Sequence, residues 1–229
     1  MDDTVLQQRS TEWRMARCGV VTASEFFKIM TPPIGKADKA ANKWSATAKK
    51  YMLTKVTELI TGVPADTFHS APTRWGIEHE EEARERAIPL IADRFGCQVE
   101  RPEGKNAFIL HSTEANIGCS PDGIIGTDAM LELKCPWNPV NYVEAVYENE
   151  MPDKHVEQLQ GSLWVTGKRW YVFCSYDPRV EGSGMDPLFI CRVERDEAYI
   201  QGILAPRVIL FRDWLHNEYT RLTGSKEPF

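Results

Sequence analysis

Three residues of this sequence have the types and spacing of a hydrolytic site: Asp122, Glu132 and Lys134. Side chains alternate between the two faces of a β-strand, so Glu132 and Lys134 project from one face while Leu133 turns into the core. A hairpin that folds residues 123–131 back on themselves would bring Asp122 next to Glu132. We therefore expect two carboxylates and an amine to lie side by side.

Two adjacent carboxylates repel each other unless a cation lies between them. Oxygen ligands without paired His or Cys favour a hard ion, so the pattern predicts Mg²⁺, with Mn²⁺ able to substitute, and the backbone carbonyl of Leu133 could add a further ligand. One ion, or two, could activate a water and stabilise a leaving oxygen, as phosphodiester hydrolysis requires. Lys134 would orient this water or help to deprotonate it.

Side chains outside the hairpin could complete such a site. Glu80 lies three residues before Ala83 and seven before Ala87, on the apolar stripe of a helical pattern, so we expect it to point inward and supply a further ligand. Gln158 and Gln160 fall on a later predicted helix, where they could hydrogen-bond the water or a phosphate.

The hydrophobic periodicity predicts the elements that must position these residues. Helices are expected to begin at 22–25 and to cover 46–61, 74–95, 138–149, 153–165 and 196–222, with Pro89 kinking or splitting the third of these and Pro206 interrupting the last. Strands are expected at 107–111, 117–119, 123–126, 130–135, 169–176 and 188–194, and loops at 31–45 and 63–73. The pattern predicts an α/β fold, one domain over residues 1–229, with a central mixed β-sheet flanked by helices.

The composition restricts the partners and the compartment. The formal net charge of the 229 residues is −6, but residues 1–60 carry ten Lys or Arg against six Asp or Glu, an excess of +4. A local basic excess is compatible with DNA phosphates, and equally with a solvated surface of mixed charges. The six cysteines form no CxxC pair and predict reduced thiols. We expect a cytoplasmic protein with no membrane segment, because no apolar run approaches a spanning length.

Short stretches spread over residues 9–200 support this interpretation together. They are Trp13 with Arg17-Cys18-Gly19-Val20-Val21-Thr22-Ala23-Ser24, Trp75-Gly76 with Glu80, Cys119-Ser120-Pro121-Asp122-Gly123, Leu131-Glu132-Leu133-Lys134-Cys135-Pro136, Gln158-Leu159-Gln160 with Trp164-Val165-Thr166, and Tyr176-Asp177-Pro178-Arg179. In this order they resemble the lambda exonuclease and YqaJ-type viral recombinase family of the PD-(D/E)xK nuclease superfamily. The acidic motif alone is short enough to occur by chance.

The resemblance implies a restriction-endonuclease-like core and a processive, Mg²⁺-dependent exonuclease. Such an enzyme degrades the 5′-ended strand of linear double-stranded DNA as a ring-shaped homotrimer and leaves a 3′ overhang for a single-strand annealing partner. The alternatives are a restriction-type endonuclease on the same core and a DNA-end-binding recombination module without catalysis.

The resemblance also implies roles for individual residues. The metal ligands would be Asp122, Glu132, Glu80 and the carbonyl of Leu133, and Lys134 would be the catalytic lysine. A pocket for the 5′-phosphate would contain Arg17, Ser24 and Ser120, with DNA contacts also expected at Trp13, Gln158 and Gln160. A guanidinium with hydroxyl groups binds phosphate well.

Overall fold

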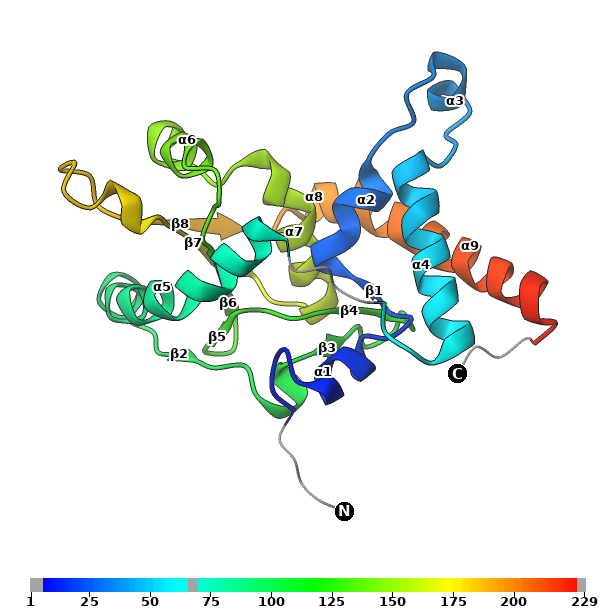
Figure 1. Cartoon of the computed structure of the whole chain (residues 1–229), viewed down its shortest axis with the longest axis horizontal. Coiled ribbons are helices and arrows are strands. Elements are labelled where there is room, and N and C mark those ends of the chain that lie inside the picture. The colour runs from blue at the N-terminus through cyan, green and yellow to red at the C-terminus, as the bar shows by residue number, and fades with distance from the viewer. Residues whose placement is uncertain (1–5, 66–69, 226–229) are drawn as a thin grey trace.

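A β-hairpin carries the predicted acidic pair, and it forms the middle of a five-stranded mixed sheet. The computed structural model describes residues 6–65 and 70–225, and its main sheet has the order β2-β5-β6-β7-β8 (Figure 1). The strands are β2 (Val99–Glu100), β5 (Gly123–Ile125), β6 (Ala129–Lys134), β7 (Trp170–Tyr176) and β8 (Leu188–Glu194). Strands β6 and β7 pair in parallel, and the other neighbours pair antiparallel. The predicted mixed sheet is confirmed.

A second, small sheet joins the N-terminal part of the chain to the segment that precedes Asp122. Its order is β1-β4-β3, and its strands are β1 (Val21–Thr22), β3 (Ile109–Leu110) and β4 (Ile117–Cys119). Strand β1 pairs with β4 in parallel, with Val21 opposite Ile117. Because Ser120 directly follows β4, this parallel pairing brings it towards the residues that directly follow β1, which include Ser24.

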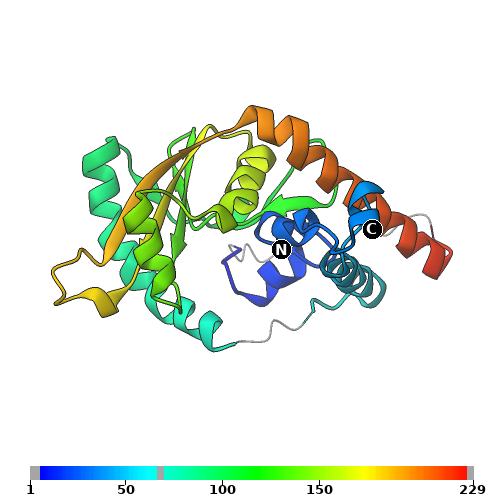
Figure 2. The ribbon, with the colours of Figure 1, turned by 90° about the horizontal axis from the view of Figure 1, so that it is seen from above.

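Helices cover both faces of the main sheet. Helix α5 (Ala71–Phe95) packs buried side chains including Ala83, Ala87 and Ile91 against the β6 face that carries Leu131 and Leu133. The opposite face carries Met130 and Phe173 and is covered by α6 (Val140–Glu148) and α7 (Val156–Thr166). Figure 2 shows α5 and α7 on opposite sides of the strands. Burial on both faces explains why β6 begins with three consecutive apolar residues, Ala129–Leu131.

A third apolar cluster fixes the N-terminal and C-terminal parts of the fold to each other. It joins α2 (Phe26–Met30), α4 (Ala46–Thr61) and α9 (Ala205–Thr223), where the rings of Tyr51 and Phe211 stack with centroids 5.4 Å apart. The other helices are α1 (Thr11–Ala16), α3 (Lys36–Ala40), α8 (Glu197–Tyr199), the π-helical η5 (Ile200–Leu204), and the 3₁₀ helices η1 (Ala23–Glu25), η2 (Gly104–Asn106), η3 (Asp153–His155) and η4 (Pro178–Val180).

Helix ends follow the local capping signals. Helix α4 begins after Ser45, whose hydroxyl accepts from the backbone N–H of Ala48 at 3.1 Å, and ends at Gly62 in the left-handed conformation, as predicted. Helix α5 begins at Ala71, three residues before the predicted start, because the Ser70 hydroxyl caps it and Pro72 fits its first turn. Of the loop predicted at 63–73, residues 66–69 lie outside the described part.

Several predictions about residues in and near the helices differ from the structure in detail. Pro89 does not split α5, which continues to Phe95; its ring is exposed, so the backbone carbonyl that loses its partner can be hydrated. Leu90, predicted on the apolar stripe, is exposed. The loop predicted at 31–45 contains the short helix α3. Pro206 lies in the first turn of α9 directly after η5, so the predicted interruption is a change of helix type.

The six cysteines are free thiols, as their spacing predicts. In the described residues, every helix is too short or too polar to cross a membrane.

Candidate active site

Glu132, Lys134 and Gln158 form a closed hydrogen-bonded group on the α7 side of β6. The Nζ of Lys134 donates to Glu132 Oε1 at 2.5 Å and to Gln158 Oε1 at 3.1 Å, and Gln158 Nε2 donates to Glu132 Oε1 at 2.5 Å. Glu132 is only 2% exposed. Leu133 points to the opposite face, towards α5, as strand alternation predicts.

Asp122 lies at the mouth of the hairpin, beside this group. Its backbone N–H donates to the carbonyl of Leu131 at 3.0 Å, and its Oδ2 accepts from the backbone N–H of Leu133 at 2.8 Å. Burial, with the negative charges of Glu132 and Glu80, raises the pKa of Asp122 to about 8. The hairpin therefore brings a half-buried acidic group, Asp122, into electrostatic contact with a buried one, Glu132.

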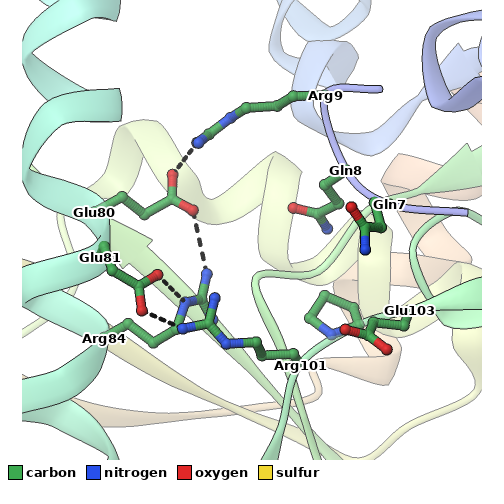
Figure 3. Close-up of a pocket in the computed structure, with 9 residues that line it drawn as sticks. Gln7, Gln8, Arg9, Glu80, Glu81, Arg84, Arg101 and Glu103 are labelled. Atoms are coloured by element: carbon green, nitrogen blue, oxygen red, sulfur yellow. Dashed lines mark hydrogen bonds and ion pairs between the residues drawn. The ribbon is translucent and has the colours of Figure 1, made fainter. Parts of the chain in front are cut away.

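Glu80 reaches the same region from α5, but both of its oxygens are engaged by arginines (Figure 3). Its Oε2 pairs with Arg9, and its Oε1 accepts from Arg84 at 3.2 Å. Arg84 also donates to the backbone carbonyl of Asp122. The inward position predicted for Glu80 is observed as a partly buried side chain, 20% exposed, facing this network.

The donor set fits a hard cation chemically, although the side chains are not arranged as a finished metal site. In the described part of the chain, no group of three or more His, Cys, Asp or Glu is placed to hold a metal ion as it stands. The carboxylates of Asp122 and Glu132 nevertheless repel each other in a buried setting, and a divalent cation would relieve that repulsion. Glu80 could become a further ligand only if one of its two arginine partners left its carboxylate.

The residues predicted to bind the 5′-phosphate meet in a second cluster. Arg17 Nη1 donates to Ser120 Oγ at 2.9 Å, and Arg17 Nη2 to Ser24 Oγ at 3.5 Å. Trp13 Nε1 donates to the same Ser120 hydroxyl at 3.1 Å, and the Arg17 guanidinium lies 4.3 Å from the centre of the Trp13 ring. Residues about 100 positions apart in sequence are thus joined through the small sheet.

Arg17 has the electrostatic character of an anion site. Within residues 6–65 and 70–225 it forms no ion pair with a carboxylate, and its hydrogen bonds go to hydroxyl groups. Burial lowers the pKa of its guanidinium, a direction that reflects the cost of holding this charge away from water. An anion placed against Arg17, Ser24 and Ser120 would compensate that charge through charge-assisted hydrogen bonds.

Gln160 is the one predicted site residue that the structure keeps away from both clusters. Its Nε2 donates to the carbonyl of Glu194 at 2.9 Å, and its Oε1 accepts from the backbone N–H of Asp196 at 2.9 Å. Both ends of the amide are therefore used to join α7 to the end of β8. Arg84, which the sequence argument missed, lies next to Asp122 instead. Its only signal was the i, i+4 spacing from Glu80, which is common on helix surfaces.

Comparisons with known proteins identify the family and the fold of the chain. The sequence model of the YqaJ-like viral recombinase domain matches residues 12–169. The structure is similar to the alkaline exonuclease LHK-Exo from Laribacter hongkongensis, at 29% identity and a TM-score of 0.77, covering 94% of this chain and 97% of that one. The complex of LHK-Exo with dAMP gives 30% identity with the same coverage and TM-score.

A third solved structure shares the fold. It is the phage-related exonuclease from Haemophilus somnus 129PT, at 18% identity, a TM-score of 0.58 and coverage of 90% of this chain and 95% of that one. No curated protein sequence matches the chain.

Proposed function

The chain belongs to the YqaJ-like viral recombinase family, and on that premise we propose that it is a Mg²⁺-dependent exonuclease that degrades linear double-stranded DNA from 5′ to 3′. One observation carries the proposal: the buried carboxylate of Glu132 is hydrogen-bonded to Lys134 and lies beside a second, half-buried carboxylate, that of Asp122. The similarity to an alkaline exonuclease over nearly the whole chain supports the same activity.

Asp122, Glu132 and the Leu133 carbonyl would hold one or two Mg²⁺ ions, for which Mn²⁺ could substitute, with Glu80 joining after it releases an arginine. A bound Mg²⁺ supplies the activation of a water and the stabilisation of the leaving oxygen. Burial lowers the pKa of Lys134, but the charges of Glu132 and Asp122 outweigh it, and the net direction is upward. A protonated Lys134 can donate to the water or to a phosphate oxygen.

Gln158 contributes by fixing Lys134. Its side-chain oxygen accepts from the lysine while its nitrogen donates to Glu132, so the amide holds both groups at one end of β6. This arrangement limits the rotamers of a long, flexible side chain, and pre-organisation of that kind lowers the entropic cost of aligning the reacting groups.

The 5′ polarity would come from the cluster around Arg17. A terminal phosphate monoester has three non-bridging oxygens, one more than a phosphodiester within the strand, which suits a guanidinium flanked by the hydroxyls of Ser24 and Ser120. Trp13 would hold Arg17 and Ser120 in place from the side. The complex of LHK-Exo with dAMP, a nucleoside monophosphate, supports recognition of a single nucleotide phosphate in this kind of fold.

The partners follow from the family and not from a contact in this chain. We propose that the protein acts on DNA ends as a ring-shaped homotrimer and passes its 3′ overhang to a single-strand annealing protein. Sedimentation of the purified protein would give its mass, for which we expect three times the 26.1 kDa of one chain.

A digestion assay with three DNA substrates tests the activity. We expect linear duplex DNA labelled at the 5′ end to release mononucleotides in Mg²⁺, the same duplex labelled at the 3′ end to retain its label until late, and closed circular duplex to remain intact. EDTA should abolish all release. Early loss of the 3′ label would contradict the polarity.

The same assay separates the two alternatives. Cutting of the closed circles would identify a restriction-type endonuclease, because an enzyme that requires an end cannot start on them. Retention of labelled ends in a filter-binding experiment, without digestion in either Mg²⁺ or Mn²⁺, would identify an end-binding module without catalysis.

A further inference from the structure

Arg84 joins the two elements that carry the proposed metal ligands. One guanidinium nitrogen, Nη1, donates to the backbone carbonyl of Asp122, and the other, Nη2, donates to Glu80 Oε1 at 3.2 Å. The third nitrogen, Nε, lies 3.7 Å from Glu81 Oε2, within ion-pair range but beyond a hydrogen bond. Figure 3 shows the guanidinium of Arg84 facing the carboxylates of Glu80 and Glu81.

The burial of this arginine indicates that it has a task other than stabilising α5. Its side chain is 5% exposed, and its neighbours on the same face of the helix, Ala83 and Ala87, are fully buried. Removing a charged group from water costs several kcal/mol before any partner compensates it, so a buried ion pair is weak evidence for stabilisation. An apolar side chain at this position would serve the packing as well.

We propose that Arg84 is a positioning residue that sets the place of Glu80 relative to Asp122 for cation binding; this inference rests on the proposed function. Glu80 comes from α5 and Asp122 from the hairpin, and Arg84 is bonded to both through one rigid, planar group. Its contact with Asp122 is to the main chain, so it leaves the Asp122 carboxylate without a guanidinium partner; the Oδ2 of this carboxylate accepts from the backbone N–H of Leu133. Arg84 itself need not touch DNA.

The two arginines on Glu80 differ in a way that fits a division of roles. Arg9 binds the other oxygen, Oε2, from the segment before α1, and its side chain is 46% exposed. An ion pair made by such an exposed arginine contributes little to stability, so a cation could replace Arg9 at low cost. Arg84 is buried and has a second anchor on Asp122, so it would remain on Oε1 and hold the carboxylate in place while Oε2 turns to the ion.

Two substitutions of Arg84 probe this role. Arg84→Lys keeps the charge, but an ammonium on a flexible stem cannot reproduce the planar fork that spans Glu80 and the Asp122 carbonyl. Arg84→Gln keeps one hydrogen-bonding group and removes the charge. Arg86→Lys is the matched control, because Arg86 lies on the same helix but pairs with Glu82 and Glu181, at 2.9 and 2.6 Å, away from Asp122.

The primary measurement is Mn²⁺ binding by titration calorimetry on the full chain without DNA, with Glu80→Gln as a reference. Residues that support metal ligands typically contribute about 10–100-fold to metal affinity. We expect Arg84→Lys to weaken Mn²⁺ binding within that range and to raise the Mg²⁺ concentration for half-maximal digestion by a similar factor. At saturating Mg²⁺, the KM of Arg84→Lys for DNA ends and its digestion rate should be close to those of wild type. Arg86→Lys should match wild type in every measurement.

Several results would overturn the proposal. Wild-type Mn²⁺ affinity in folded Arg84→Lys and Arg84→Gln would remove Arg84 from the positioning of the ligands, as would a rate defect that excess Mg²⁺ does not repair. Loss of folding in both variants, judged by circular dichroism and thermal unfolding, would make Arg84 a purely structural residue. Failure of the wild-type chain itself to bind Mn²⁺ would instead reject the proposed metal site, which keeps the two failures distinguishable.

Discussion

Lys134 and Glu132 form an ion pair along a single strand, with Nζ 2.5 Å from Oε1, and the carboxylate of this pair is almost fully buried. The two residues are neighbours on one face of β6 because side chains two apart in a strand point the same way. Removal of Lys134 leaves the buried Glu132 carboxylate without its ion-pair partner, so the substitution affects stability as well as function.

Lys134→Ala should therefore remove digestion and lower stability together. General acid–base and positioning groups typically contribute about 10²–10⁴-fold to a rate, and we expect a loss of that size in the Mg²⁺-dependent digestion of linear duplex DNA. Circular dichroism at the assay temperature must show that the variant is folded. Undiminished digestion by the folded variant would remove Lys134 from the mechanism.

Arg17→Lys should slow the digestion of DNA with 5′-phosphorylated ends more than that of DNA with 5′-hydroxyl ends. A hydrogen bond to a charged group contributes about 1.5–3 kcal/mol. A lysine cannot reproduce the contact of two guanidinium nitrogens with the terminal phosphate, so kcat/KM on 5′-phosphorylated ends should fall by roughly 10–100-fold. The matched substrate is the same duplex with 5′-hydroxyl ends. Wild type should degrade these ends more slowly, and the variant should degrade both substrates at similar rates. Equal rates of the wild type on both substrates would refute the assignment of Arg17.

The residues of the hairpin site could be predicted from the sequence, because strand alternation and a short connection bring them together. A period of two places Glu132 and Lys134 together, and a short connection returns the chain to Asp122. The cluster of Arg17, Ser24 and Ser120 required the family resemblance, since these residues meet through the pairing of β1 with β4, which no local pattern indicates.

The predictions that differ from the structure concern residues whose environment is set by tertiary contacts. Gln158 and Gln160 are two positions apart on one helix, roughly 200° around its axis, so they cannot face the same group; Gln158 meets Lys134 and Gln160 meets the end of β8. Arg84 could not be distinguished from its exposed neighbours by spacing alone, because its burial depends on how α5 packs against the hairpin.

Gly161→Ala tests the packing that places α7, and with it Gln158. A Cβ on Gly161 would lie 2.4 Å from a ring carbon of Phe26, so the added methyl forces the core apart. Overpacking of this kind typically costs about 1–3 kcal/mol, and we expect the free energy of unfolding in urea to fall by that amount. Gly202→Ala is the matched control, since nothing lies within 4 Å of a Cβ there, and it should leave stability unchanged or slightly higher. Equal stability of both variants would contradict the close contact between α7 and α2.

The response of stability to acid should depend on His155, which packs against Phe173 with ring centroids 5.4 Å apart. Burial, together with the positive charges of Lys134 and Lys154, lowers the pKa of His155 to about 3. In the unfolded chain the imidazole has a pKa near 6.5. Between these values the unfolded state binds one more proton than the folded state, so stability is retained above pH 6.5 and falls as the pH decreases towards 3.

His155→Gln removes the group that binds this proton, so the free energy of unfolding should depend less on pH below 6.5. One proton corresponds to at most about 1.4 kcal/mol per pH unit, so the free energy of unfolding of the variant should fall less steeply than that of wild type between pH 6 and 4, by up to this slope. Urea unfolding at a series of pH values measures both slopes, and carboxylates elsewhere cancel in the difference. Parallel curves for the two proteins would show that the imidazole titrates normally in the folded state, and hence that the contact with Phe173 does not keep it from water.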